Sequence, residues 1–140
     1  MSGSGGGIRI GVDLQAVPRF AAIAAHERYR ALIFTPAELA QAEGLDPCRY
    51  TERLAGRFSA KEAVCKVLGR GFLQGLVWRD VEVVTDRWGA PQVRLTGGAA
   101  RVAELAGVRH IAVTLTHQSD LVVAVAVADG RPGVAHDGQQ

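Results

Sequence analysis

The feature that most constrains the fold is the stretch from Arg49 to Leu68, which favours one long helix. It contains good helix formers and no proline, and its large apolar side chains form a stripe along one helical face: Leu54, Phe58, Val64, Val67 and Leu68. Gly69 and Gly71 follow and are expected to end the helix. Ser59 and Glu62 have the spacing of a capping box that would start a separate helix there. The apolar stripe runs through Ser59 without a break, so the sequence favours a single helix.

Alternating hydrophobicity predicts a strand near the N-terminus. Ile8, Ile10, Val12 and Leu14 alternate with polar residues or glycine, which is typical of a strand with one buried face. Asp13 falls on the opposite face, so we expect its side chain to point away from the core.

The remaining segments predict a mixed fold. Segments 81–85 and 92–95 alternate on either side of a turn-rich loop and predict a hairpin. Residues 110–115 predict a further strand. The continuously apolar segment 121–127 predicts a strand covered on both faces, with alanines on one face and valines on the other.

Shorter helices are expected between these strands. Pro18 can begin a helix that continues to about His26. Thr35, Pro36 and Glu38 have the pattern of a capped helix start, and that helix is expected to end near Gly44. A short helix is expected over residues 99–105.

The length of 140 residues fits one domain, and neither an internal repeat nor a linker divides the chain. We expect a flexible Gly/Ser-rich leader over residues 1–7, a single domain over 8–129 and a flexible tail over 130–140. The predicted fold class is α+β, with an antiparallel sheet packed against the long helix.

Composition excludes several classes of function. The chain is 48% hydrophobic and 21% charged, and it has no apolar run long enough to cross a bilayer, so a soluble protein with no membrane partner is expected. A net charge of +2 is too small to favour nucleic acid as a partner. Cys48 and Cys65 are the only cysteines and no secretory signal precedes them, which favours the cytoplasm and free thiols.

Candidate functional residues occur in two places, at Asp13 and in the stretch 49–70, and each could instead have a purely structural role. A dense basic group could receive phosphates or an acidic protein surface, or could be a solvated helix face: Arg49, Arg53, Arg57, Lys61, Lys66 and Arg70. Glu62 and Lys66 share a helical face, and such a pair can be a surface ion pair worth roughly 0.2–0.5 kcal/mol. Asp13 alone could be a helix cap or a loop residue.

These motifs together resemble the holo-acyl-carrier-protein synthase family of phosphopantetheinyl transferases. The resemblance is carried by GVDLQAVPRF near the start and RFSAKEAVCKVLGRG in the middle, and it extends to FTPAEL, VEVVTDRWGAPQVRL and VTLTHQSDLVVAVAVA. It implies a homotrimer with the active site between subunits. It also implies transfer of 4′-phosphopantetheine from coenzyme A to a serine of an apo-acyl carrier protein, which yields the holo-carrier and 3′,5′-ADP.

The resemblance also implies roles for individual residues. Asp13 and Glu62 match the two carboxylates that bind Mg²⁺, a cation that prefers oxygen ligands. Glu62 and Lys66 match catalytic residues, and the base that deprotonates the serine is either Glu62 or a metal-bound water. The matches to coenzyme A-binding residues are Arg57, Lys61, Lys66, Gly89, Pro91 and His117, and those to carrier-protein-binding residues are Arg19, Phe20 and Arg28.

Two positions depart from the family pattern. Ala16 stands where the family has a glutamate, and Gln118 follows His117 where relatives can carry an aspartate. The sequence leaves open whether the carrier serves fatty acid or polyketide biosynthesis. It also leaves two alternatives of other classes, a noncatalytic trimeric module that binds coenzyme A or a carrier protein, and an oligomerising domain whose charged helix is only surface.

Overall fold

The computed structural model describes residues 7–69 and 76–130. The flexible leader and tail predicted for the two ends fall almost entirely on residues 1–6 and 131–140, which lie outside the described residues. Arg70, counted in the basic group, and Gly71, expected to end the long helix, also lie outside them.

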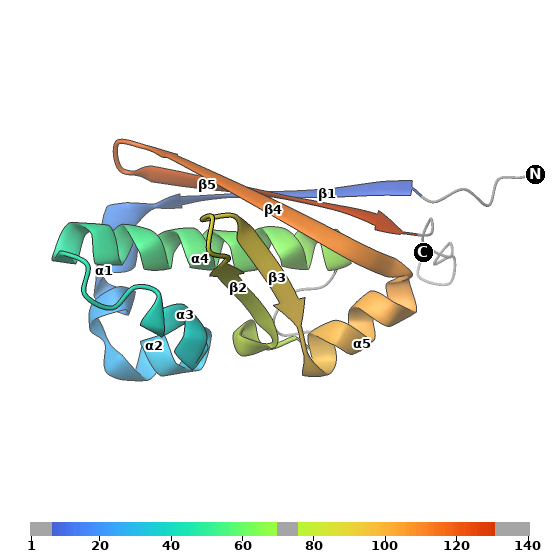
Figure 1. Cartoon of the computed structure of the whole chain (residues 1–140), viewed down its shortest axis with the longest axis horizontal. Helices are drawn as coiled ribbons and strands as arrows, with labels where there is room; N and C mark the ends of the chain where they lie inside the picture. The colour runs from blue at the N-terminus through green and yellow to red at the C-terminus, as the bar shows by residue number, and fades with distance from the viewer. Residues whose placement is uncertain (1–6, 70–75, 131–140) are drawn as a thin grey trace, which may run out of the picture.

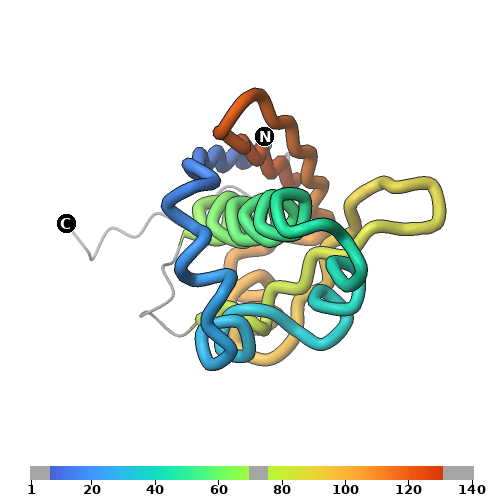
Figure 2. Tube along the Cα trace, turned by 90° about the vertical axis from the view of Figure 1, so that its left-hand side faces the viewer, coloured from blue at the N-terminus to red at the C-terminus, as the bar shows by residue number. Residues whose placement is uncertain are grey.

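The predicted long helix is α4, Pro47–Leu68, and it forms the centre of the molecule (Figure 1). Asp46 caps its start by accepting a hydrogen bond from the Arg49 backbone N–H at 3.0 Å. Gly69 ends it in the left-handed conformation, with φ of 76°. The helix continues through Ser59, which confirms the prediction of one helix. Figure 2 shows α4 nearly end-on, with the main sheet on one side and the smaller elements on the other.

One side of α4 is covered by an antiparallel sheet with the strand order β1-β5-β4. Its strands are β1, Gly7–Ala16; β4, Val108–Gln118; and β5, Leu121–Gly130. The alanines of β5 are buried on the face towards α4, because the helix approaches too closely for larger side chains: Ala124, Ala126 and Ala128. Val123, Val125 and Val127 lie on the other face, as the alternation predicted, whereas Val122 is buried on the same face as the alanines.

The orientation predicted for β1 is wrong. Its apolar side chains lie on the outer face and are largely exposed, with exposed fractions of 76% for Ile8, 64% for Ile10, 48% for Val12 and 56% for Leu14. The face with Asp13 and Gly11 meets α4 instead. The reason is the close approach at Gly11, where a Cβ atom would lie 2.1 Å from the Ala63 carbonyl oxygen.

The prediction that β5 is covered on both faces is wrong for the single chain. Leu121 is 45% exposed and Val127 is 40% exposed. These residues continue the apolar surface of β1 onto the neighbouring strand, since Val12 pairs with Val125 and Ile10 with Val127. We call this apolar outer surface of β1 and β5 the outer sheet face.

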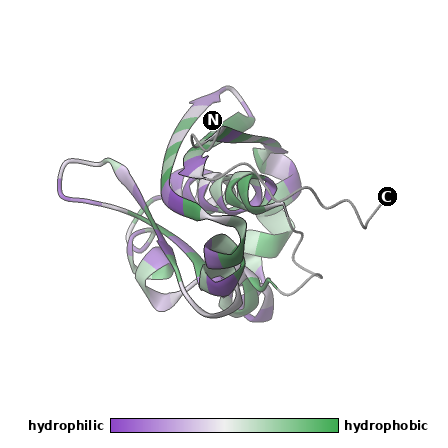
Figure 3. Ribbon diagram, turned by 90° about the vertical axis from the view of Figure 1, so that its right-hand side faces the viewer, coloured by the Kyte–Doolittle hydropathy of each residue, from purple (hydrophilic) through white to green (hydrophobic). Residues whose placement is uncertain are grey.

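The opposite side of α4 carries the predicted hairpin and helix. The hairpin consists of β2, Val81–Thr85, and β3, Pro91–Leu95, and it follows a short 3-10 helix, η1, at Trp78–Asp80. Helix α5 spans Gly97–Ala106. The hairpin tip projects from the body of the molecule in the end-on view of Figure 3. Val81 and Val83 are fully buried and belong to the main hydrophobic core with α4, α5 and the sheet.

Three short helices precede α4: α1, Val17–Ala25; α2, Glu27–Ile33; and α3, Pro36–Ala40. Helix α1 packs against α4, α2 packs against α1, and α3 packs against β2. The capping box of α3 is confirmed, because Thr35 Oγ1 accepts from the Glu38 N–H at 3.2 Å and Glu38 Oε1 accepts from the Thr35 N–H at 2.9 Å. Helix α2 was not predicted. Over the described ranges, none of the helices combines the length and apolar character needed to span a bilayer.

Candidate active site

The first group of candidate residues lies where the inner face of β1 meets α4. Ser59 Oγ lies 3.0 Å from Asp13 Oδ2, and Gln15 Nε2 donates to the same oxygen at 2.8 Å. Lys66 Nζ lies 3.7 Å from Asp13 Oδ1 and donates to the Val12 carbonyl at 2.7 Å. The Asp13 side chain is only 12% exposed, so β1 and α4 hold it in one place.

Glu62 belongs to the same group. Its Oε2 accepts a hydrogen bond from Trp78 Nε1 at 3.3 Å. Burial raises the pKa of Glu62, and the nearby charge of Asp13 raises it further, while the Trp78 hydrogen bond and Lys66 act in the opposite direction. Asp13 and Glu62 are therefore close enough for their charges to interact. We call Asp13, Glu62 and Lys66 the carboxylate–lysine group.

The chemistry of this group fits a magnesium ion. Mg²⁺ is usually held by one or two carboxylates, and water and substrate phosphate oxygens complete its octahedral shell. In the described segments, no cluster of three or more His, Cys, Asp or Glu side chains is placed to bind a metal. The charge of Asp13 disfavours ionisation of Glu62, and a cation between the two carboxylates would offset this effect. The protein would thus supply two ligands and leave the others to water and substrate.

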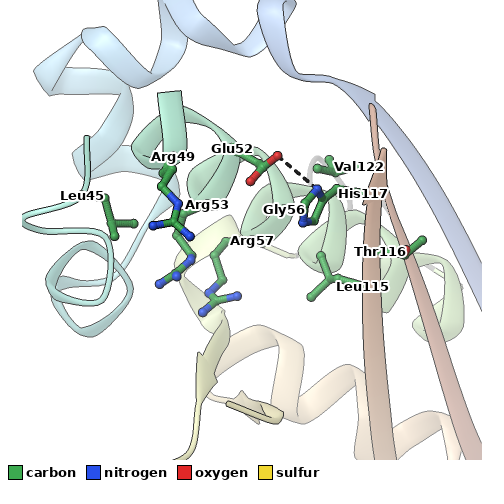
Figure 4. Close-up of a pocket in the computed structure, with 10 residues that line it drawn as sticks. All are labelled: Leu45, Arg49, Glu52, Arg53, Gly56, Arg57, Leu115, Thr116, His117 and Val122. Atoms are coloured by element: carbon green, nitrogen blue, oxygen red, sulfur yellow. Dashed lines mark ion pairs between the residues drawn. The ribbon is translucent and has the colours of Figure 1, made fainter. Parts of the chain in front are cut away.

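The second group lines a cavity of about 240 Å³ beside the first half of α4 (Figure 4). Three arginines at successive turns of α4, Arg49, Arg53 and Arg57, lie on one side, and Leu115 and His117 from β4 lie on the other. His117 Nδ1 is 3.2 Å from Glu52 Oε2, and this contact joins the end of β4 to α4. We call this cavity the arginine pocket.

Arg57 is the buried member of the three arginines, with an exposed fraction of 4%. Its Nη2 donates to Gln41 Oε1 at 3.3 Å, whereas its Nε has no hydrogen-bond partner within the described part of the chain. Burial lowers the pKa of Arg57 to about 10, the charge of Arg53 lowers it too, and Glu38 opposes the shift. Arg57 also lines the cavity, where a guanidinium group suits an anionic ligand.

The structure contradicts the expected role of Lys61 in coenzyme A binding. Lys61 is fully buried, and its Nζ lies 2.9 Å from Glu38 Oε1. It also donates to the backbone carbonyls of Trp78 and Val81. Its three donor positions are therefore used inside the core, and no ligand can reach them. The face of α4 that carries Lys61 is covered by α3 and β2, which the basic pattern alone did not indicate.

The structure also contradicts the expected contact of Phe20 with a carrier protein. Phe20 is 2% exposed, and its ring packs against Phe34 and Phe58 with centroid distances of 6.1 and 5.2 Å. Arg19 and Arg28, predicted for the same partner, are both exposed on α1 and α2.

Gly89 and Pro91, predicted to bind coenzyme A, lie in the hairpin. Gly89 is at its tip and Pro91 is the first residue of β3. Asp86 Oδ1 accepts hydrogen bonds from two N–H groups of this loop.

Sequence reasoning missed two residues of the carboxylate–lysine region. Ser59 was weighed only as a helix cap, although it lies three residues before Glu62 and so shares its side of α4. The second missed residue is Trp78. Its contact with Glu62 depends on the fold of η1, and the sequence contains no local signal for it.

Comparison with known proteins identifies a family that this chain resembles over most of its length. Residues 9–126 match the family model described as the 4′-phosphopantetheinyl transferase superfamily. A holo-[acyl-carrier-protein] synthase of Desulforudis audaxviator is 44% identical, and the match covers 86% of this chain and 92% of the relative. The corresponding protein of Frankia alni is 40% identical, with coverage of 87% and 97%.

Solved structures of acyl carrier protein synthases have a fold similar to that of this chain. The complex of a Chronobacterium ammoniagenes ACPS with CoA superposes with a TM-score of 0.78 at 28% identity, covering 90% of this chain and 99% of that one. The acyl carrier protein synthase of Mycobacterium tuberculosis superposes with a TM-score of 0.64 at 40% identity, with coverage of 90% and 100%.

Proposed function

The chain belongs to the 4′-phosphopantetheinyl transferase superfamily, and from this premise we propose that the carboxylate–lysine group and the arginine pocket are the two parts of its active site. The protein is a transferase that moves 4′-phosphopantetheine from coenzyme A to a serine of an apo-acyl carrier protein, with 3′,5′-ADP as the other product. The observation that carries the site assignment is the meeting of Asp13, Glu62 and Lys66 from two separate elements.

Asp13 and Glu62 would hold Mg²⁺ together with phosphate oxygens of coenzyme A. The bound cation would neutralise negative charge on the pyrophosphate. The charge of Asp13, which helps to raise the pKa of Glu62, and the limited exposure of Asp13 support this assignment.

The transfer is a displacement at the β-phosphorus of coenzyme A. The serine oxygen forms a bond to this phosphorus while the bond to the leaving 3′,5′-ADP oxygen breaks. The serine proton goes to Glu62 or to water. Lys66 has a side chain that is 56% exposed beside Asp13, and its ammonium group would stabilise the charge that develops on the phosphate oxygens.

The arginine pocket would bind other phosphate groups of coenzyme A. The positive charge of its three arginines supports this role, and His117 would contribute from β4. Gly89 and Pro91 of the hairpin would approach the nucleotide. Lys61 takes no part, since it is enclosed in the core.

The outer sheet face supports a homotrimer. Monomeric proteins in water rarely leave a continuous apolar patch of this kind exposed. Ile8, Ile10, Val12 and Leu14 of β1 would be buried against neighbouring subunits, and each complete site would lie between two chains.

The partner carrier protein would dock near α1 and α2. Arg19 and Arg28 are exposed there and suit a carrier with an acidic surface around its serine. Free thiols at Cys48 and Cys65 suit the reducing cytoplasm, which we propose as the compartment.

The test is to incubate the protein with coenzyme A, Mg²⁺ and an apo-acyl carrier protein and to measure the intact mass of the carrier. We expect a Mg²⁺-dependent gain of one phosphopantetheine. Glu62→Gln should lower the rate at least about a hundredfold, because a metal ligand loses its charge. The matched control, Glu43→Gln on the exposed turn after α3, should transfer at the normal rate.

Two results would count against parts of the proposal. Near-normal transfer by Glu62→Gln would overturn the metal assignment. Binding of coenzyme A by the wild type without mass gain in any of several apo-carriers would replace the transferase with a binding module.

A further inference from the structure

Gln41 connects the hairpin to the arginine pocket. It lies at the end of α3, and its side-chain amide pairs with Thr85 at the end of β2: Nε2 donates to the Thr85 carbonyl at 3.0 Å, and Oε1 accepts from the Thr85 N–H at 2.9 Å. The same Oε1 accepts from Arg57 Nη2 at 3.3 Å. The backbone carbonyl of Gln41 accepts from Arg53 Nη1 at 2.6 Å. One residue therefore binds both inner arginines of the pocket and one strand of the hairpin.

These contacts hold two like charges in place without neutralising them. Arg53 and Arg57 repel each other, and Arg57 is buried, so both need acceptors to keep a fixed position. An amide oxygen and a backbone carbonyl are neutral acceptors, so these hydrogen bonds add no negative charge beside the two guanidinium groups. Lys61, one turn further along α4, shows the opposite arrangement, because the carboxylate of Glu38 neutralises it.

We propose that Gln41 is a positioning residue for anion binding, which orients Arg53 and Arg57 with neutral acceptors so that their charge remains available to a phosphate in the arginine pocket. Gln41 does not touch the ligand itself. This role rests on the proposed function, since the phosphate is taken to belong to coenzyme A.

Gln41→Glu tests the neutrality of the acceptor, because it keeps the size of the side chain and places a carboxylate against the two arginines. We expect the KM for coenzyme A and the Kd for 3′,5′-ADP, measured by titration calorimetry, to rise by about tenfold or more. The kcat should stay within about twofold of the wild type, since the carboxylate–lysine group is unchanged. The affinity for 3′,5′-ADP should also depend less on salt concentration.

Gln41→Met tests the loss of the side-chain acceptor without a new charge. We expect a smaller rise in the Kd for 3′,5′-ADP than with Gln41→Glu, but a larger fall in melting temperature, since every side-chain hydrogen bond is lost. A purely structural role predicts the reverse order for binding, because the variant with fewer remaining hydrogen bonds would then bind worse. Ala40→Glu, which adds the same charge at the neighbouring exposed residue, is the control and should bind normally.

The outcomes separate the two proposals. Transfer by the wild type with an unchanged KM and Kd in Gln41→Glu overturns the role of Gln41 alone. Absence of transfer by the wild type overturns the proposed function. In that case a weaker binding of 3′,5′-ADP by Gln41→Glu still supports the positioning role, and unchanged binding contradicts it.

Discussion

Lys61 and Arg57 lie about one turn apart on α4, and both are buried, but the protein stabilises their charges in different ways. Lys61 has a carboxylate partner and two backbone carbonyls. Arg57 has an amide oxygen and one N–H without a partner in the described part of the protein. The charge of Lys61 is thus neutralised inside the core. Arg57 has no carboxylate hydrogen-bonded to it in the described part of the protein and lines the arginine pocket.

The buried pair predicts a large stability effect. Lys61→Met should lower the free energy of unfolding by about 3–5 kcal/mol, because Glu38 would keep a buried charge without its partner. Urea denaturation followed by circular dichroism measures this change. Lys61→Met combined with Glu38→Gln should recover part of the loss. A KM for coenzyme A that rose in Lys61→Met at temperatures where it is folded would instead support a binding role for this lysine.

The two cysteines should differ in reactivity. Burial raises the pKa of the Cys65 thiol to about 12, with the charge of Glu62 adding to the effect and Lys61 opposing it. Cys48 is exposed. At pH 8 a thiol reagent such as DTNB should therefore titrate one cysteine in the native protein and both in denaturant, and none in native Cys48→Ser.

The raised pKa of Cys65 predicts how the free energy of unfolding changes with pH. The folded-state pKa of Cys65 lies above the ordinary thiol value of 9.0, so the unfolded chain loses this proton first as pH rises. The contribution of Cys65 is fully present below pH 9 and should be lost between pH 9 and about 12. Urea denaturation at pH 8 and pH 10 measures the loss, and Cys65→Ala should show a smaller decrease over this range.

At the scale of elements, the contact between β1 and α4 determines the geometry of the site. Gly11 allows the strand to approach the helix, and Asp13, two residues further on, reaches Ser59 because of that approach. The strand and the helix must therefore keep their separation for the carboxylate–lysine group to exist.

Gly11→Ala tests this requirement. Its Cβ would lie 2.1 Å from the Ala63 carbonyl oxygen, so strand and helix must move apart. We expect a loss of about 1–3 kcal/mol in the free energy of unfolding, together with at least a tenfold fall in the transfer rate at temperatures where the protein is folded. Gly7→Ala is the matched control, because its Cβ would have no described atom within 4 Å. Equal behaviour of the two variants would contradict this account.

The elements also show what could be predicted from the sequence. Helix α4, the capping box at Thr35 and the hairpin were predicted because their signals are local: helix formers, a cap and a turn between alternating segments. Helix α2 was missed because it has only seven residues and no side-chain cap.

The orientation of β1 could not be predicted from its alternation alone. A period of two shows which residues share a face, but not which face meets the helix. The same limit applies to the site. Asp13, Glu62 and Lys66 lie together in the structure, and their shared role stays a prediction. Lys61 and Phe20 were expected at binding surfaces but are buried, because their burial depends on α3, β2 and the ring packing around α1.

For the whole molecule, the outer sheet face predicts the oligomeric state. Light scattering should give a mass about three times that of the 14.8 kDa chain, as expected when an exposed apolar face closes an assembly. Ile10→Glu places a charge in the centre of this face and should yield single chains with little transfer activity.

Leu105→Glu is the control for this experiment. Leu105 is 76% exposed on α5, away from the outer sheet face, so the variant should keep the mass and activity of the wild type. A wild-type protein that is fully active as a single chain would contradict both the trimer and the shared site.

Strand β1 restricts the kinds of genetic change that this protein can tolerate. Its inner face carries Gly11 and Asp13, and its outer face carries Ile10 and Val12. Inserting or deleting one codon within the strand would exchange the two faces beyond that point. The carboxylate would then face outward and a branched side chain would meet the Ala63 carbonyl. Substitutions in β1 can therefore be tolerated, whereas a change in its length would disrupt both the carboxylate–lysine group and the outer sheet face.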